Sequence, residues 1–414
     1  MKILELNISN YKGFREQTRF SFSEHFTVIA GVNGRGKTTI LDALALLFSH
    51  LIPQISEASF QQRRINKSEI NIGGREAILS INANCAGIPI QYSVKVEPTR
   101  TSPITRLQEV VANEIKSAYG NPFRSDDQAP LAVYYTIDRA GYRFPKTLPQ
   151  VERSGQAMAY SGALLNNLVD YQDFMSRYRV SIALTYDRET RNTSYMGDNV
   201  VRAINNAIEY FLDGFSRLEV KERPLRFLVT KNSEELDLRQ LSDGERALIA
   251  MICDLGRRLA LANPSLQNPL EGSGVVLIDE LELHLHPKWQ MEIAEKLRRA
   301  FPNIQFIVTT HSPFIIQTAR QGEVIKLDGD LDVDPYGKSL EEIAKFVMEV
   351  ENTEYSPRIK NMREIARSYF RLVEEARTAD NRRKEEIKNA IIRLLEPFSD
   401  NPAYTALLES KGLI

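Results

Sequence analysis

The sequence is poor in cysteine and tryptophan, and its charges nearly cancel. It has two cysteines and one tryptophan in 414 residues, with a formal net charge of −1 at pH 7. Cys85 and Cys253 stand singly in apolar segments, which excludes a disulfide framework and the paired spacing of a zinc site. We expect both to be small buried side chains. Any contact with nucleic acid must come from local basic patches, since the whole chain has no positive field.

Long hydrophobic runs and long heptad arrays are also missing. No apolar stretch approaches the length of a membrane span, and the N-terminus begins with a strand pattern rather than a signal peptide. We therefore expect a cytoplasmic protein without membrane contact. The absence of heptads excludes a long coiled-coil arm. The hydrophobic share of 43% and the charged share of 26% are those of an ordinary globular protein.

A glycine-rich loop is the most informative stretch of the chain. Gly31 to Thr39 reads GVNGRGKTT, and it lies between the apolar runs Phe26–Ala30 and Ile40–Phe48. This order predicts a strand, a tight loop and a helix, which is the context of a nucleoside triphosphate site. Small residues let backbone N–H groups close around a polyphosphate, and the helix N-terminus adds partial positive charge. The predicted nucleotide-binding residues are Asn33, Gly34, Arg35, Gly36, Lys37, Thr38 and Thr39.

Two side chains of this loop have predicted roles of their own. Lys37 is expected to reach the β- and γ-phosphates, and the Thr38 hydroxyl to ligate Mg²⁺. A second strand, Val275–Ile278, ends in Asp279 and Glu280. Asp279 would hold Mg²⁺ directly or through water, and Glu280 would orient or deprotonate the attacking water. Neighbouring side chains on a strand point in opposite directions, so both can act only if the strand ends there.

Strands and helices alternate around these motifs. A helix is expected to begin within Leu241–Arg246, and the strand Gln305–Thr310 ends at His311. Functional residues at strand ends predict an α/β domain with a largely parallel sheet. Ala77–Ala83 and Ile90–Val96 alternate in polarity and predict an antiparallel pair.

In this order the motifs resemble those of the ABC-type ATPases of the SMC, RecF and overcoming-lysogenization-defect group. Gly31 to Thr39 matches the Walker A loop, and Leu241–Arg246 resembles the LSGGQ signature. Val275 to Glu280 matches Walker B with its catalytic glutamate, and His311 matches the switch histidine. The resemblance implies a P-loop NTPase head with a mixed sheet and a mostly parallel core.

The resemblance also implies a site shared between two copies of the chain. In this group two heads enclose two ATP molecules, and the signature of one head caps the γ-phosphate bound by the other. The corresponding residues here are Ser242, Gly244 and Glu245, while Glu280 would activate water and His311 would bind the γ-phosphate. Asp243 and Glu245 depart from the signature, and Leu281 stands where Walker B is usually followed by proline. The glutamine-loop residue stays open among Gln61, Gln62 and Glu69.

Four regions are expected along the chain. They are the first part of the head (1–144), a helical insertion (145–226), the second part of the head (227–335) and a helical tail (336–414). A surface loop is expected at 187–198. The acidic pairs within 328–334 predict an acidic hairpin rather than the metal site of a nuclease domain.

The helical tail resembles that of the ATPase subunit of Septu-type and retron-linked anti-phage systems, whose partner is a separate HNH nuclease. The resemblance implies an ATPase that lacks its own nuclease and regulates that partner. Two alternatives stay open. One is a RecF-like DNA-repair ATPase that binds DNA directly, and the other is an ATP-dependent assembly scaffold with little turnover.

A basic stripe marks the tail. Arg363, Arg367 and Arg371 recur every fourth residue, so they share one helix face. The stripe suits a phosphate backbone or an acidic partner surface. The alternative is a solvated face balanced by the nearby Glu364, Glu374 and Glu375.

Overall fold

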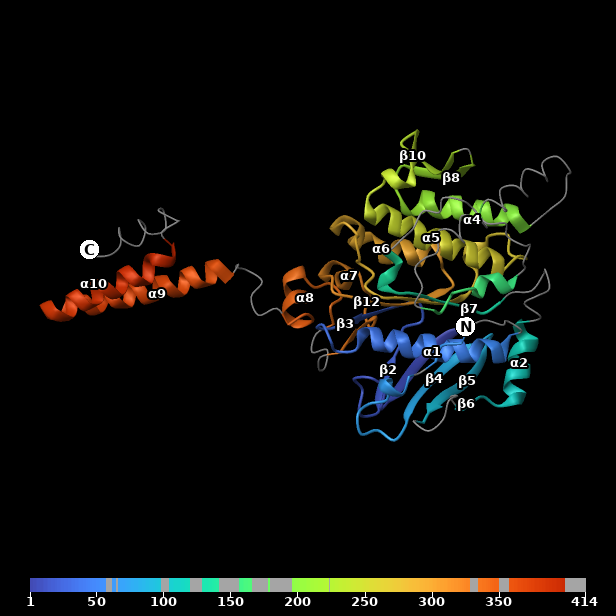
Figure 1. Ribbon diagram of the computed structural model, residues 1–414, viewed down its shortest axis with the longest axis horizontal. Helices are drawn as coiled ribbons and strands as arrows, with labels where there is room; N and C mark the ends of the chain where they lie inside the picture. Colours follow the sequence, from blue (N-terminus) through green and yellow to red (C-terminus); the bar gives the residue numbers. More distant parts are fainter. Residues whose placement is uncertain are drawn as a thin grey trace. The chain divides into compact units, whose positions relative to one another are not determined.

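The computed structural model divides into two compact units, Met1–Glu349 and Val350–Ile414 (Figure 1). It describes residues 1–56, 62–64, 66–97, 104–119, 129–140, 156–165, 178, 196–222, 224–327, 334–349 and 357–398. The predicted loop at 187–198 therefore lies almost wholly outside the described residues, as do most of the acidic pairs within 328–334.

A parallel sheet forms the centre of the first unit. Its five strands are ordered β13-β3-β12-β11-β7, and every pairing is parallel. Their bounds are Leu131–Tyr135 (β7), Phe26–Ala30 (β3), Gly274–Ile278 (β11), Ile304–Thr310 (β12) and Val324–Lys326 (β13). Every residue of β3, β7, β11 and β12 is buried, as expected for a sheet covered on both faces. The predicted parallel core is confirmed.

A second sheet is antiparallel and has the order β2-β1-β4-β5-β6. Its strands are Lys2–Ser9 (β1), Thr18–Ser21 (β2), Ala77–Cys85 (β4), Ile88–Val96 (β5) and Ile104–Arg106 (β6). The predicted antiparallel pair is β4 and β5, joined by a turn at Ala86 and Gly87. The antiparallel strands thus make sheets of their own beside the parallel core.

Helix α1, Lys37–Ile55, lies between these two sheets and contacts both (Figure 1). It is hydrophobic on all sides because neither face meets solvent. It is also long and apolar enough to cross a membrane by length and composition, and the only such helix among the described residues. The expectation that no apolar stretch approaches that length was therefore wrong. Burial in the core explains its composition, and the cytoplasmic location stays a prediction.

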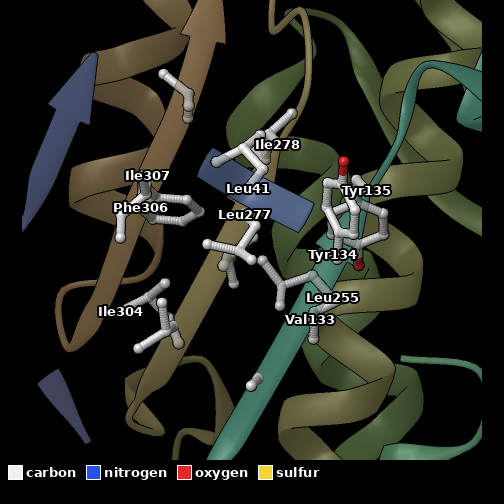
Figure 2. Close-up of a cluster of buried hydrophobic side chains, with 14 of the residues drawn as sticks. Leu41, Val133, Tyr134, Tyr135, Leu255, Leu277, Ile278, Ile304, Phe306 and Ile307 are labelled. Carbon is white, nitrogen blue, oxygen red and sulfur yellow. The ribbon is translucent and has the colours of Figure 1, made fainter. Parts of the chain in front are cut away.

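Helix α5, Asp243–Ala262, covers the other face of the parallel sheet, with α4, Met196–Phe211, packed on it (Figure 1). Figure 2 shows the core that results, where Leu41 of α1 and Leu255 of α5 gather with side chains of β7, β11 and β12. Both cysteines are free and buried, as expected. Burial raises the pKa of the Cys85 thiol to about 11.

A third sheet was missed by the sequence analysis. It is antiparallel, with the order β10-β9-β8, and its strands are Phe215–Glu222 (β8), Leu225–Lys231 (β9) and Glu234–Asp237 (β10). The helical insertion predicted at 145–226 includes α4, but residues near its end form strand β8 rather than a helix. A bulge between Ser216 and Leu218 interrupts the alternation of β8 and hides the strand. Asn232 and Ser233, both with positive φ, form the hairpin turn between β9 and β10.

Short helices complete the first unit. They are α2 (Glu109–Tyr119), α6 (Pro287–Ala300), α7 (Pro313–Gln317) and α8 (Leu340–Phe346), with 3₁₀ turns at Lys67–Glu69, Ile137–Ala140, Gln156–Tyr160, Leu238–Gln240 and Pro269–Glu271.

The second unit is a helical hairpin in its described part. Helices α9, Pro357–Thr378, and α10, Asn381–Leu395, lie within the predicted helical tail, and a 3₁₀ turn at Glu396–Phe398 follows. Asp380 caps α10 by accepting a hydrogen bond from the backbone N–H of Arg383. Four buried residues form the core of the hairpin, namely Tyr369, Val373, Ile387 and Ile391. The part of the predicted tail beyond residue 398 lies outside the described residues.

Candidate nucleotide-binding site

The glycine-rich loop connects β3 to α1 as the sequence predicted. Gly36 is the N-cap of α1 with φ of 101°, and Gly34 has φ of 83°. Both backbone conformations favour glycine. A Cβ on Gly36 would also lie 2.9 Å from two ring carbons of Phe14. Gly36 is therefore required twice, once by its backbone conformation and once by the aromatic ring beside it.

Lys37 folds back over this loop. Its Nζ donates hydrogen bonds to the carbonyl oxygens of Gly31 (2.8 Å) and Val32 (3.1 Å), and the residue is buried. These acceptors are neutral carbonyls, whereas a phosphate oxygen carries charge and makes the stronger bond. The loop thus holds an ammonium group at the place where a polyphosphate would enter.

Thr38 and Asp279 meet across the site. The Thr38 hydroxyl donates to the Asp279 carboxylate, with Oγ1 at 2.9 Å from Oδ2 and 3.2 Å from Oδ1. Adjacent oxygen ligands of an octahedral Mg²⁺, each at about 2.1 Å, lie about 2.9 Å apart. The pair therefore fits two neighbouring positions on Mg²⁺, which usually takes its other ligands from water and phosphates. Among the described residues no group of three or more His, Cys, Asp or Glu offers an alternative metal site.

Thr309, at the end of β12, fixes both Walker B residues. Its hydroxyl donates to Asp279 Oδ1 at 2.6 Å and accepts the backbone N–H of Glu280 at 2.8 Å. Glu280 has φ of 47°, an uncommon conformation for a residue other than glycine. This turn ends the strand, and so both Asp279 and Glu280 face the same pocket.

That pocket has a volume of about 220 Å³. Its lining joins the glycine-rich loop, the end of β11 and the end of β12, and consists of Asn33, Gly34, Gly36, Lys37, Thr38, Thr39, Asp279, Glu280 and His311. Every one of these was a predicted site residue. Of the remaining predictions, Arg35 is exposed on the loop, and Ser242, Gly244 and Glu245 lie elsewhere among the described residues.

The signature residues cap the start of α5. Ser242 is the N-cap, its hydroxyl accepts the Glu245 N–H at 3.3 Å, and its own N–H donates to Glu245 Oε2 at 2.9 Å. Lys231 Nζ bonds Glu245 Oε1 at 2.7 Å. Burial raises the pKa of Glu245, but the bonds from Lys231 and Ser242 together hold it below its ordinary value. Glu245 is therefore an ionised capping residue.

Gly244 is required by packing against the segment that follows Walker B. A Cβ on Gly244 would lie 2.3 Å from the carbonyl oxygen of His284. The start of α5 and the segment that follows Walker B are therefore in direct contact within one chain. Lys231, Thr309 and this contact were not found from the sequence, although Thr309 and Thr310 directly precede the predicted His311.

The glutamine-loop residue is not identified by this geometry. Gln61 lies outside the described residues, and Gln62 is exposed. Glu69 pairs with Lys12, with its Oε1 at 3.4 Å from Nζ. Neither Gln62 nor Glu69 lines the pocket.

A parallel sheet with a glycine-rich loop, Walker B carboxylates and a histidine around one pocket defines an ABC-type ATPase. The chain belongs to the family described as "AAA domain, putative AbiEii toxin, Type IV TA system", which matches residues 26–317. The match covers more than half of the chain and includes every residue that lines the pocket.

The chain is related to retron ATPases and to PtuA. It is 29% identical over 379 residues to the Retron Ec83 probable ATPase of Escherichia coli, which covers 77% of this chain and 70% of the relative. It is 27% identical to the Retron Vc95 probable ATPase of Vibrio cholerae serotype O1 biovar El Tor, over 94% of this chain and 86% of the relative. The Septu protein PtuA of Bacillus thuringiensis is 25% identical, with coverage of 88% and 89%.

Solved SMC head domains are similar in structure. The SMC head bound to the C-winged helix domain of ScpA matches with a TM-score of 0.48 and 18% identity, over 76% of this chain and 91% of that chain. The SMC head domain from Thermotoga maritima matches with a TM-score of 0.42 and 18% identity, over 78% and 93%.

Proposed function

We propose that this protein binds ATP with Mg²⁺ between two copies of the chain, hydrolyses it slowly, and thereby regulates a separate HNH nuclease in anti-phage defence. One observation carries the ATPase part. The glycine-rich loop, both Walker B carboxylates and His311 line a single pocket.

The arrangement of charge supports hydrolysis. Lys37 would bind the phosphates, and Thr38 with Asp279 would hold Mg²⁺, which supplies charge neutralisation to the phosphates. Glu280, turned into the pocket by its left-handed backbone, would orient and deprotonate the attacking water. His311 would donate a hydrogen bond to the γ-phosphate from the end of the neighbouring parallel strand, β12.

The position of the signature supports a dimer. Ser242 and Gly244 do not line the pocket formed by the described residues of one chain. An α-helix N-terminus suits an anion, and a second copy would bring this one to the γ-phosphate. The nucleotide would then be enclosed only when two chains form a dimer, so nucleotide binding and dimer formation would depend on each other.

The relatives support the biological setting. Two are named as probable ATPases of retrons and one as the Septu protein PtuA. An HNH nuclease partner is proposed because the tail resembles that of ATPase subunits which work with one. Local basic patches leave nucleic acid as a further candidate partner.

Glu280→Gln tests the catalytic assignment. The variant retains the shape of the pocket but removes the base, so we expect steady-state hydrolysis to fall by roughly 10²- to 10⁴-fold. With ATP and Mg²⁺ it should accumulate as a dimer, measured by size-exclusion chromatography with light scattering. Equal hydrolysis by wild type and variant would remove the assignment. Glu235→Ala, a solvent-exposed carboxylate on β10, is the matched control.

A scaffold with little turnover is a second candidate. It is favoured by the Ser242 hydroxyl, which already donates to Glu245 Oε2 at 2.9 Å and is not free to meet a phosphate without rearrangement. Dimerisation by ATP without measurable hydrolysis in the wild type would select this alternative.

A further inference from the structure

Glu282 lies two residues after the proposed catalytic Glu280, and its carboxylate binds the next strand end. Oε2 accepts the Thr310 hydroxyl at 2.7 Å, and Oε1 accepts the backbone N–H of His311. Both carboxylate oxygens therefore accept hydrogen bonds from residues at the end of β12. No ion pair involves Glu282 among the described residues, so its partners are a hydroxyl and an amide rather than a cation.

The backbone around Glu282 is fixed on both sides. The Leu281 N–H donates to the Thr309 carbonyl at 2.9 Å, which extends the pairing of β11 with β12 beyond the end of the strand. The Leu283 N–H donates to the Glu280 carbonyl at 2.9 Å, and the Leu285 N–H to the Glu282 carbonyl at 2.8 Å. These successive turns leave Glu282 little freedom to point elsewhere.

A second polar side chain joins the same two segments. Gln290 of α6 accepts the Ser312 hydroxyl at 2.6 Å and donates to the Leu285 carbonyl at 2.7 Å. Residues Thr310 to Ser312 are thus held at two points to the segment that follows Walker B.

We infer that Glu282 is a positioning residue, which holds His311 at the pocket in register with Glu280. The inference rests on the proposed ATPase function, because it concerns where His311 stands relative to the phosphate. Without the carboxylate, the His311 amide loses its acceptor and the strand end is free to shift. Such a shift affects the hydrolysis step more than nucleotide binding, since Lys37, Thr38 and the loop are untouched.

The segment that contains Glu282 also contacts the signature. The segment that contains Glu282 continues to His284, whose carbonyl oxygen is the atom that leaves no room for a side chain on Gly244. His284 itself has φ of 61°, so the segment is sharply turned there. Glu282 therefore joins His311 in the pocket of one chain to the start of α5 in the same chain, which would cap the pocket of the second copy.

Three variants separate positioning from direct catalysis. Glu282→Gln retains an acceptor oxygen for the His311 amide and adds an amide group beside Thr310, so it should retain most of the wild-type kcat. Glu282→Asp retains the charge but is one methylene shorter and does not reach both partners. We expect Glu282→Asp and Glu282→Ala to lower kcat by about 10-fold or more, with nucleotide Kd changed less than about twofold.

A double-mutant cycle with His311 gives the decisive measurement. If Glu282 acts through His311, Glu282→Ala adds no further loss of kcat in a His311→Ala background. Additive losses would overturn the inference, and so would an inactive Glu282→Gln beside an active Glu282→Asp, which is the pattern of a direct base. Glu235→Ala again serves as the control, and thermal unfolding with nucleotide binding confirms that each variant is folded.

Failure of this inference is distinguishable from failure of the proposed function. No ATP hydrolysis by the wild type refutes the function itself. A wild type that hydrolyses ATP, together with a Glu282→Ala variant of unchanged kcat, refutes only the role of Glu282.

Discussion

The nucleotide pocket and the start of α5 contain the two halves of the proposed ATP site. The polar side chains of the two halves have different kinds of hydrogen-bond partner. In the pocket, Lys37 donates hydrogen bonds to neutral carbonyls, and Thr38 donates to the carboxylate of Asp279. At the start of α5, Ser242 and Glu245 form hydrogen bonds with each other, and Lys231 donates to the Glu245 carboxylate. The pocket is ready for a charged ligand, whereas the signature is first of all a helix cap.

The two halves are also tied together within one chain. On α5, Asp254 is buried between Arg257 and Arg258, and it accepts the Tyr135 hydroxyl at 3.0 Å. The carbonyl of Tyr135 in turn accepts the backbone N–H of Asp279 at 2.9 Å. The helix that carries the signature is thus anchored to the strand that carries Walker B.

Breaking this anchor should have the largest effect. Asp254→Asn leaves two buried guanidinium groups without their carboxylate, which costs about 3–5 kcal/mol in the free energy of unfolding. Chemical denaturation measures it, with Glu235→Ala as the surface control. A change below about 1 kcal/mol would mean that the arginines find other partners.

The same carboxylate predicts how stability depends on pH. Burial raises the pKa of Asp254, but the charges of Arg258 and Arg257 outweigh burial and lower it to about 2. Because the folded pKa lies below the ordinary value of 3.8, this stabilisation is present above about pH 4 and is lost as the pH falls toward 2. Thermal unfolding across that range should show a smaller decline for Asp254→Asn than for wild type.

The pocket half is tested by Lys37→Ala. Removing the ammonium group should weaken ATP binding by about 100-fold, on the order of 2.7 kcal/mol, while the fold stays intact. Titration with a fluorescent ATP analogue measures the Kd. Lys345→Ala on α8 removes an exposed lysine outside the pocket lining and should leave the Kd unchanged.

The signature half is tested by Gly244→Ala. The added methyl group meets the His284 carbonyl, so we expect a loss of about 1–3 kcal/mol in stability from overpacking. Dimer formation with ATP should weaken as well, because the start of α5 must move. Nucleotide binding by the monomer should change little, and an equal loss there would show that the two halves are not separable.

The smallest effect is expected at the basic stripe in the second unit. Arg367 and Arg371 of α9 are exposed, and neither has an ion pair in the part of the chain that the structure describes. Glu375, instead of balancing the stripe, bonds Arg383 of α10 at 2.8 Å. Arg367→Ala with Arg371→Ala should leave stability within about 0.5 kcal/mol.

Binding measurements decide whether the stripe is functional. If it is, the double variant should bind a partner or DNA more weakly, with a smaller dependence on salt. Unchanged assembly and unchanged DNA binding would leave the stripe as a solvated face.

Sequence reasoning succeeded where function and local structure depend on neighbouring residues. Gly34 and Gly36 signal a loop because their backbone angles suit few other residues, and the buried runs of β11 and β12 read directly as strands. It failed at β8, where a bulge broke the alternation, and at residues whose role depends on another strand. Thr309 is an ordinary strand residue until β11 places Asp279 and Glu280 beside it.

The amino-acid sequence by itself determined the class of this protein, because the glycine-rich loop, the paired carboxylates and His311 each have a local pattern that chemistry requires. Only the tertiary structure decided which partners hold them. The contacts of Glu282 with Thr310 and His311, and of Gly244 with His284, join residues far apart in sequence. Such contacts depend on the register of parallel strands and the packing of α5, which no local pattern specifies.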